Sequence, residues 1–247
     1  MKTVRVPLVL AASLLLVSCA LAAGAARADQ APDGGQPGPF AVGHLSLMLN
    51  DPSRTSDLGS RPVPVEVFYP VDASAITEST PEAVYPLDPL NESWPPTVSS
   101  DWEAYGYDRA WEGIAASAER PFPLVVFSPG WGTPIWAHNF LALRLASHGI
   151  VVAVLYHYGD AFFPEEQFDH ISIACLNRPL DVSFVLTHLL AANATPGDPL
   201  EGLVDPELVA ASGLAVVALD ARRALVESHT ADDDRSEAGD RAAGKAG

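Results

Sequence analysis

Pro123-Leu-Val-Val-Phe-Ser128, Pro129-Gly-Trp-Gly132 and Ile150-Val-Val-Ala-Val-Leu155 are the three pieces of sequence that decide the fold. The two apolar runs are typical of strands that are buried on both faces of a sheet. Between them the glycines indicate a tight turn, Pro134 suits the first turn of a helix, and Gly149 suits its end. Strand, helix and strand in this order predict a βαβ unit with parallel strands and a right-handed crossover.

The segments that precede this unit predict a hairpin and a long loop. Residues 40–49 have strand character, and residues 63–69 alternate in a pattern typical of a strand. Because proline cannot donate to a sheet ladder, Pro64 favours a hairpin at the edge of the sheet. Residues 73–120 are rich in proline and aromatic side chains and are expected to form an ordered loop, with one short helix near residues 108–118.

The segments that follow the unit predict a further helix and a third parallel strand. Asn177 is a suitable N-cap, with Pro179 in the first turn and apolar residues three or four apart beyond it. Residues 208–212 are a candidate strand, and a helix is compatible with residues 214–225. We therefore assign residues 40–228 to one domain and expect residues 229–247, which lack large apolar side chains, to be a disordered tail.

The N-terminal residues predict export. Lys2 and Arg5 precede an apolar run over residues 6–16, and Ala26-Arg-Ala28 fits a cleavage site for a signal peptide. The run is short for a bilayer span, which needs about 20 residues. Residues 1–28 are therefore interpreted as a signal peptide and residues 29–39 as a flexible linker.

A second fate is open within the same segment. Leu16-Val-Ser-Cys19 matches the pattern of a bacterial lipobox, in which lipid attached to Cys19 holds the protein to a membrane surface. The protein is then either secreted or periplasmic, or it is anchored to the cell envelope through Cys19. Either fate places it outside the cytoplasm.

The charge balance excludes one class of partner. The chain has 14 Lys and Arg against 31 Asp and Glu, and loss of residues 1–28 leaves 11 basic against 31 acidic side chains, a net charge of −20. A surface this acidic repels phosphate backbones, so nucleic-acid binding is not expected. The acidic residues around His157 and His170 have no recognised metal spacing and are interpreted as a solvated loop, so no metal is predicted.

Four segments together resemble a known superfamily: residues 61–70, residues 122–132, the helix that begins at Arg178-Pro-Leu-Asp181, and residues 204–213. Their order and spacing are similar to those of α/β-hydrolases. The likeness is greatest to the branch that holds platelet-activating-factor acetylhydrolases and dienelactone-hydrolase-like enzymes. It covers roughly residues 40–213 and rests on the order of the segments, since no single segment is diagnostic.

The resemblance implies a fold, a reaction and a site. The fold is α/β, a mostly parallel sheet flanked by helices, here C-terminally incomplete. The reaction is hydrolysis of a small-molecule ester or a lipid ester by a serine nucleophile, without a cofactor. In the family, the loop at the positions of Gly130, Trp131 and Gly132 contributes backbone N–H groups to the oxyanion hole, and glycines there let the backbone approach the substrate closely.

The sequence departs from the family where the nucleophile belongs. The family places Gly-x-Ser-x-Gly after the strand that matches residues 209–212, but here Gly213 is followed by Leu-Ala-Val-Val. His229 is the last histidine and lies in the predicted tail, and Cys175 is expected to be a small buried residue rather than a nucleophile. The catalytic residues are therefore unknown, and this chain is predicted to be inactive.

Two explanations of that departure stay open. The chain is either a truncated or frame-shifted form of a longer hydrolase, or a natural non-catalytic derivative. A derivative of the second kind would be an envelope lipoprotein or a binding protein on a hydrolase-like scaffold.

Overall fold

The structure is a computed structural model that describes residues 33–213, apart from residues 87–88, 91–95, 134 and 160–170. The signal peptide with Cys19, the segment 214–225 and the predicted tail therefore lie outside the described residues. No helix within the described part of the chain is both long and apolar enough to cross a membrane.

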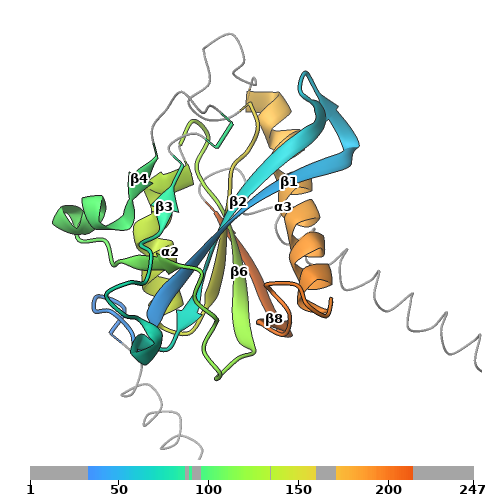
Figure 1. The fold of residues 1–247 in the computed structure, drawn as a ribbon. Helices are drawn as coiled ribbons and strands as arrows, with labels where there is room; N and C mark the ends of the chain where they lie inside the picture. Colours follow the sequence, from blue (N-terminus) through green and yellow to red (C-terminus); the bar gives the residue numbers. More distant parts are fainter. Residues whose placement is uncertain (1–32, 87–88, 91–95, 134, 160–170, 214–247) are drawn as a thin grey trace, which may run out of the picture. The chain divides into compact units, whose positions relative to one another are not determined.

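A six-stranded sheet forms the centre of the fold (Figure 1). In spatial order its strands are β5 (Ala110–Glu112), β1 (Ala41–Ser56), β2 (Gly59–Val71), β7 (Val151–Leu155), β6 (Phe122–Ser128) and β8 (Val204–Gly213). Strand β6 pairs in parallel with both β7 and β8, whereas β2 is antiparallel to β1 and to β7. The predicted βαβ unit and the third parallel strand are confirmed, and so is the α/β fold class.

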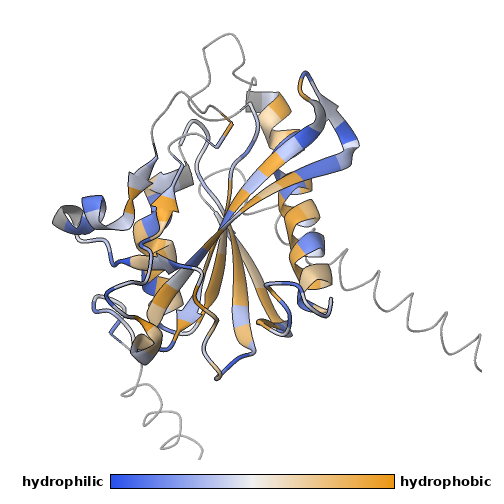
Figure 2. Ribbon diagram, viewed as in Figure 1, coloured by the Kyte–Doolittle hydropathy of each residue, from blue (hydrophilic) through white to orange (hydrophobic). Residues whose placement is uncertain are grey.

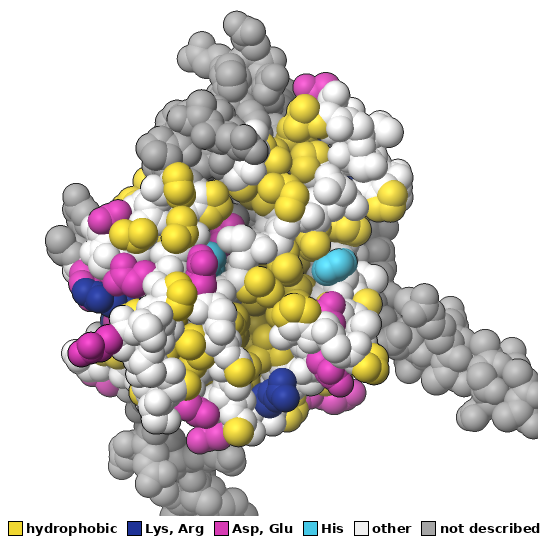
Figure 3. Space-filling model, viewed as in Figure 1, with side chains coloured by type: hydrophobic (Ala, Val, Ile, Leu, Met, Phe, Trp, Pro, Cys, Tyr) yellow, Lys and Arg dark blue, Asp and Glu magenta, His cyan; other side chains and the backbone are white. Residues whose placement is uncertain are grey.

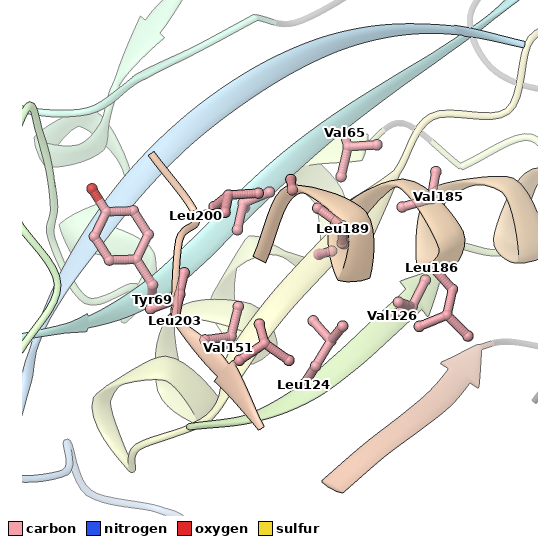
Figure 4. Close-up of a cluster of buried hydrophobic side chains, with 14 of the residues drawn as sticks. Val65, Tyr69, Leu124, Val126, Val151, Val185, Leu186, Leu189, Leu200 and Leu203 are labelled. Atoms are coloured by element: carbon pink, nitrogen blue, oxygen red, sulfur yellow. The ribbon is translucent and has the colours of Figure 1, made fainter. Parts of the chain in front are cut away.

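Helices α2 (Asn139–Ser147) and α3 (Ile171–Asn193) lie on opposite faces of the sheet (Figure 1). On the α3 face, Val65 and Val126 of the sheet pack with Leu186 and other apolar side chains of the helix (Figure 4). On the α2 face, Phe68 and Val154 belong to a second buried cluster with helix residues such as Leu143. Strand β6, which lies between β7 and β8, is accordingly apolar, whereas the far end of the β1–β2 hairpin is hydrophilic (Figure 2).

The predicted hairpin is confirmed, but its expected place at the edge of the sheet is wrong. Strand β2 lies between β1 and β7, and β5 extends the sheet beyond β1. Pro64 is compatible with this position because it lies one residue before the ladder between β2 and β7, and its carbonyl still accepts a hydrogen bond from the N–H of Tyr156. The ladder between β2 and β7 covers only residues 65–68, and Pro64 therefore deprives it of no donor.

Three local predictions need correction. Residues 108–118 contain strand β5 instead of a helix, because residues 110–112 pair with β1. Helix α3 spans Ile171–Asn193, so that Pro179 lies inside it, and the buried Ala174 shows that its packed face extends upstream of Asn177. The helix expected from Pro134 starts with a 3-10 turn, η3 (Ile135–His138), before α2.

In its described residues the loop between β2 and β6 is ordered, as expected. It contains the 3-10 helices η1 (Ala73–Ala75) and η2 (Ser99–Tyr105) and a small sheet of β3 (Val84–Tyr85) with β4 (Thr97–Val98). Tyr85 is buried in the α2-side cluster, and Trp102 packs against that cluster, with its ring centroid 5.0 Å from that of Trp136. The aromatic side chains of the loop thus cover the sheet.

Candidate functional site

The carboxyl ends of β6 and β7 bring together polar side chains in a buried cluster. Ser128 is the last residue of β6, His157 follows the end of β7 by two residues, and Asp181 comes from α3. Ser128 Oγ lies 2.7 Å from His157 Nε2, and His157 Nδ1 lies 2.9 Å from Asp181 Oδ2. This edge of an open α/β sheet is where such folds place their sites.

Two arginines complete the cluster. Arg61, near the start of β2, donates from Nε and Nη2 to the two oxygens of Asp181 over 2.8 and 2.9 Å. Arg178 of α3 donates from Nη2 to Ser128 Oγ over 2.9 Å and also to the carbonyl oxygen of Pro129. We refer to Ser128, His157, Asp181, Arg61 and Arg178 as the Ser128 cluster.

The carboxylate of Asp181 is the negative centre of this cluster. Arg54 Nη2 adds a further ion-pair contact at 2.7 Å, although it is not aligned for a hydrogen bond. Burial by itself raises the pKa of Asp181, but hydrogen bonds from Arg61 and His157 and the positive charge around the carboxyl lower it by more. The pKa of Asp181 therefore lies below its usual range, and the group is ionised at neutral pH.

The Ser128 cluster has the hydrogen-bond order of a serine nucleophile, a base and an orienting acid, yet substrate has no access to it. Ser128 is 0% exposed and His157 is 4% exposed. The hollow next to them, lined by described residues from the β6 and β7 ends and by Arg178, leaves no space for a molecule as large as water. A nucleophile must reach the substrate carbonyl, so this geometry fits a structural role instead.

The residues predicted for the oxyanion hole follow the cluster directly. Gly130 comes after Pro129 and accepts a hydrogen bond from the N–H of Thr133 over 3.0 Å, which closes a tight turn. Gly132 has φ +73°, a conformation that favours glycine, and Trp131 is 42% exposed. The loop thus lies at the surface. At its start, the carbonyl of Pro129 is held by a hydrogen bond from Arg178.

The strand that would lead to a nucleophile elbow lies beside this loop. Strand β8 pairs with β6 up to its last residue, Gly213, which is opposite Ser128. The sequence therefore departs from the Gly-x-Ser-x-Gly motif at the same end of the strands from which the predicted oxyanion loop follows.

Several sequence expectations change at this point. His157 is buried in the Ser128 cluster, so its assignment to a solvated acidic loop is wrong, while residues 160–170 lie outside the described part. Cys175 is half-buried on α3 instead of fully buried. Within the described residues no group of three or more His, Cys, Asp or Glu side chains is placed to hold a metal ion.

Sequence reasoning did not identify the Ser128 cluster as a unit. Its signals were polar residues at apolar positions: Arg61 at the start of a valine-rich strand, and Arg178 and Asp181 three residues apart on one face of an apolar helix. Both helix residues are at most 1% exposed.

Comparisons with known proteins support the fold. No protein-family model matches the sequence, and no curated protein does either. The structure is similar to that of a ferulic acid esterase from Streptomyces cinnamoneus, with a TM-score of 0.52 and 26% identity, over 76% of this chain and 56% of the esterase chain. The chain has an α/β-hydrolase fold and spans little more than half the length of that esterase. A particular likeness to platelet-activating-factor acetylhydrolases is not borne out by this match.

Proposed function

We propose that this chain carries the oxyanion loop of a carboxylic ester hydrolase and that it does not hydrolyse esters by itself. The observation that carries the proposal is the bond from Arg178 to the Pro129 carbonyl, which fixes the loop of Gly130, Trp131 and Gly132 at the carboxyl edge of the parallel strands. A small-molecule or lipid ester is the substrate class that this loop would serve, and the likeness to an esterase favours the same class.

The chemistry of ester hydrolysis explains the form of the loop. Attack on an ester carbonyl generates an oxyanion, and rigid N–H groups stabilise it only if they are already aimed at its position. A loop that is anchored at Pro129 and contains two glycines can present backbone N–H groups close to a substrate. Arg178, a buried cation of the Ser128 cluster, keeps that anchor in place.

The Ser128 cluster, in this proposal, positions the loop and is not the catalytic relay. Arg178 donates a hydrogen bond to Ser128 Oγ. When the imidazole of His157 is neutral and Nδ1 donates to Asp181, the hydroxyl of Ser128 donates its hydrogen bond to Nε2. The hydroxyl of Ser128 therefore accepts one hydrogen bond and donates another within the protein interior. A working nucleophile would instead be expected after β8, where the sequence offers Gly213-Leu-Ala-Val-Val.

Labelling of the purified full chain with a fluorophosphonate probe tests whether it is catalytic. We expect no labelling of the wild-type chain or of Ser128→Ala, beside an active serine esterase as the positive control. Labelling that disappears in Ser128→Ala would identify Ser128 as a nucleophile and overturn the proposal. Labelling that persists in this variant would overturn it as well, because another serine would then be reactive.

A separate measurement tests the oxyanion loop. Titration with phenylphosphonate, a stable oxyanion, is expected to shift the backbone amide NMR signals of Trp131 and Gly132. In a variant with Trp131→Pro, which removes one of these N–H donors, the shift at Gly132 should weaken. Shifts confined to other parts of the chain would contradict the assignment of the loop.

Export of the protein is a further part of the proposal. It is supported by the charge and apolar pattern of residues 1–28 and by the lipobox-like sequence at Cys19. Mass spectrometry of the mature N-terminus in a bacterial host distinguishes the two fates. A start at residue 29 indicates a cleaved signal peptide, a lipidated Cys19 indicates an anchored form, and an intact Met1 in the cytoplasm contradicts export.

A further inference from the structure

A pocket of about 340 Å³ lies beside the hairpin, away from the Ser128 cluster. It is lined by residues of β1 and β2 and of the loop that follows β2, namely Ser46, Leu47, Met48, Pro64, Glu66, Val84, Pro86, Pro89 and Pro96. None of these residues lines the hollow at Ser128 or belongs to the predicted oxyanion loop. The volume is at the lower end of the range for sites that bind small molecules.

Glu66 is the charged group of this pocket. It projects from β2, is 2% exposed, and uses one oxygen, Oε2, for two partners: Ser46 Oγ at 2.6 Å and His44 Nε2 at 2.5 Å. The other oxygen, Oε1, has no hydrogen-bond donor among the described residues. Within the described residues, Oε1 is not one of the fully buried polar atoms that lack a partner, so it is accessible to solvent where Glu66 lines the pocket. It can accept a hydrogen bond from a ligand there.

The walls of the pocket offer few hydrogen-bond donors and much apolar surface. Four of the lining residues are prolines, which have no backbone N–H, and Val84 and Met48 add apolar surface. The lining is therefore suited to an apolar body, with Glu66 as the point that fixes its orientation.

The charge around Glu66 favours a cation over a neutral donor. Glu112 Oε1 lies 3.6 Å from His44 Nδ1, so a second carboxylate stands behind the histidine that contacts Glu66. The whole chain has a net charge of −17, and acidic side chains are spread over the face drawn in Figure 3, where basic ones are few. Such a field attracts cations to the pocket.

We propose that this pocket binds a small primary amine as its ammonium ion. The ammonium group donates to Glu66 Oε1, and the apolar part of the amine packs against the prolines and Met48. An alkylammonium ion is charged at neutral pH, as the lysine side chain is, and it offers three donors. This site is independent of the proposed ester chemistry.

Calorimetric titration of the full chain with n-hexylammonium, and with 1-hexanol as its neutral counterpart, tests the proposal. Wild-type protein should bind the amine at least about tenfold more tightly than the alcohol, and Glu66→Gln should lose this preference. Glu207→Gln, which removes the same charge from an exposed site on β8, should bind the amine as the wild type does.

A second variant keeps Glu66 intact. Met48 lines the pocket and is 52% exposed, so Met48→Trp should obstruct the pocket and reduce amine binding without loss of the buried Glu66 contacts. Equal binding of amine and alcohol, or unchanged amine binding in both Glu66→Gln and Met48→Trp, would overturn the proposal. A loss of binding in Glu207→Gln as large as that in Glu66→Gln would overturn it too, since the effect would then be one of net charge.

Discussion

Two buried carboxylates, Asp181 and Glu66, have opposite surroundings. Asp181 receives hydrogen bonds on both oxygens, from Arg61 and His157, and a further ion-pair contact from Arg54. Glu66 receives its two hydrogen bonds on a single oxygen and lines an open pocket. A saturated carboxylate holds segments of the chain together, whereas an unsaturated one has capacity left for a ligand.

The difference extends to the cations that each group meets. Asp181 is flanked by guanidinium groups, which are always charged and bind carboxylates with two parallel hydrogen bonds. Glu66 has instead a histidine and an exposed serine as its neighbours. We therefore expect stability to depend strongly on Asp181 and weakly on the partners of Glu66.

The largest effect is expected for Asp181→Asn. Loss of this charge leaves Arg61 buried without its counter-ion, and breaking a buried pair in this way costs about 3–5 kcal/mol. Urea denaturation followed by circular dichroism at pH 7 measures the loss. Glu207→Gln, at an exposed position, is the control and should change stability by less than about 0.5 kcal/mol. A loss in Asp181→Asn no larger than in the control would mean that Arg61 does not depend on Asp181.

A smaller effect on the free energy of unfolding is expected when the pH is lowered. The pKa of Asp181 is lower in the folded state than in the unfolded chain, so its stabilisation is complete above about pH 5 and is lost as the pH falls further. The difference in unfolding free energy between the wild type and Asp181→Asn should therefore be constant from pH 7 to about 5 and narrow below about pH 4. Urea titrations across this range measure it, and a gap that stays constant to pH 2.5 would contradict the assignment.

The smallest effect is expected for Ser46→Ala. Ser46 is exposed and supplies one hydrogen bond of 2.6 Å to Glu66, while His44 keeps its own. We expect a loss of about 0.5–1 kcal/mol in urea denaturation, because water replaces the hydroxyl at an exposed position. A loss comparable to that of Asp181→Asn would show that Glu66 is as dependent on its protein partners as Asp181 is.

The central part of the fold could be predicted from local patterns. The apolar runs at residues 123–128 and 150–155, with glycines and a proline between them, are enough to indicate two buried parallel strands. The position of β2 beside β7 could not be predicted in this way, because it depends on pairing between residues more than 80 positions apart. Pro64 even indicated an edge strand, but it lies one residue outside the β2–β7 ladder, where the sheet needs no donor from it.

The candidate sites were harder to predict than the sheet. Arg61, Arg178 and Asp181 stood out only as charged residues among apolar ones, and a single sequence does not say which charges become partners. The Glu66 pocket depends on a proline-rich loop that has no periodicity to place it over the sheet. The loop of Gly130, Trp131 and Gly132 was located by resemblance, and its role is still a prediction.

The bond between Arg61 and Asp181 closes a segment of 120 residues. We expect a contact so far apart in sequence to form late in folding, because closing a long loop costs entropy before the contact repays it. Interactions absent from the transition state slow unfolding without accelerating folding. We therefore expect the Ser128 cluster to contribute mainly to kinetic stability, so that its loss increases the unfolding rate more than it lowers the folding rate.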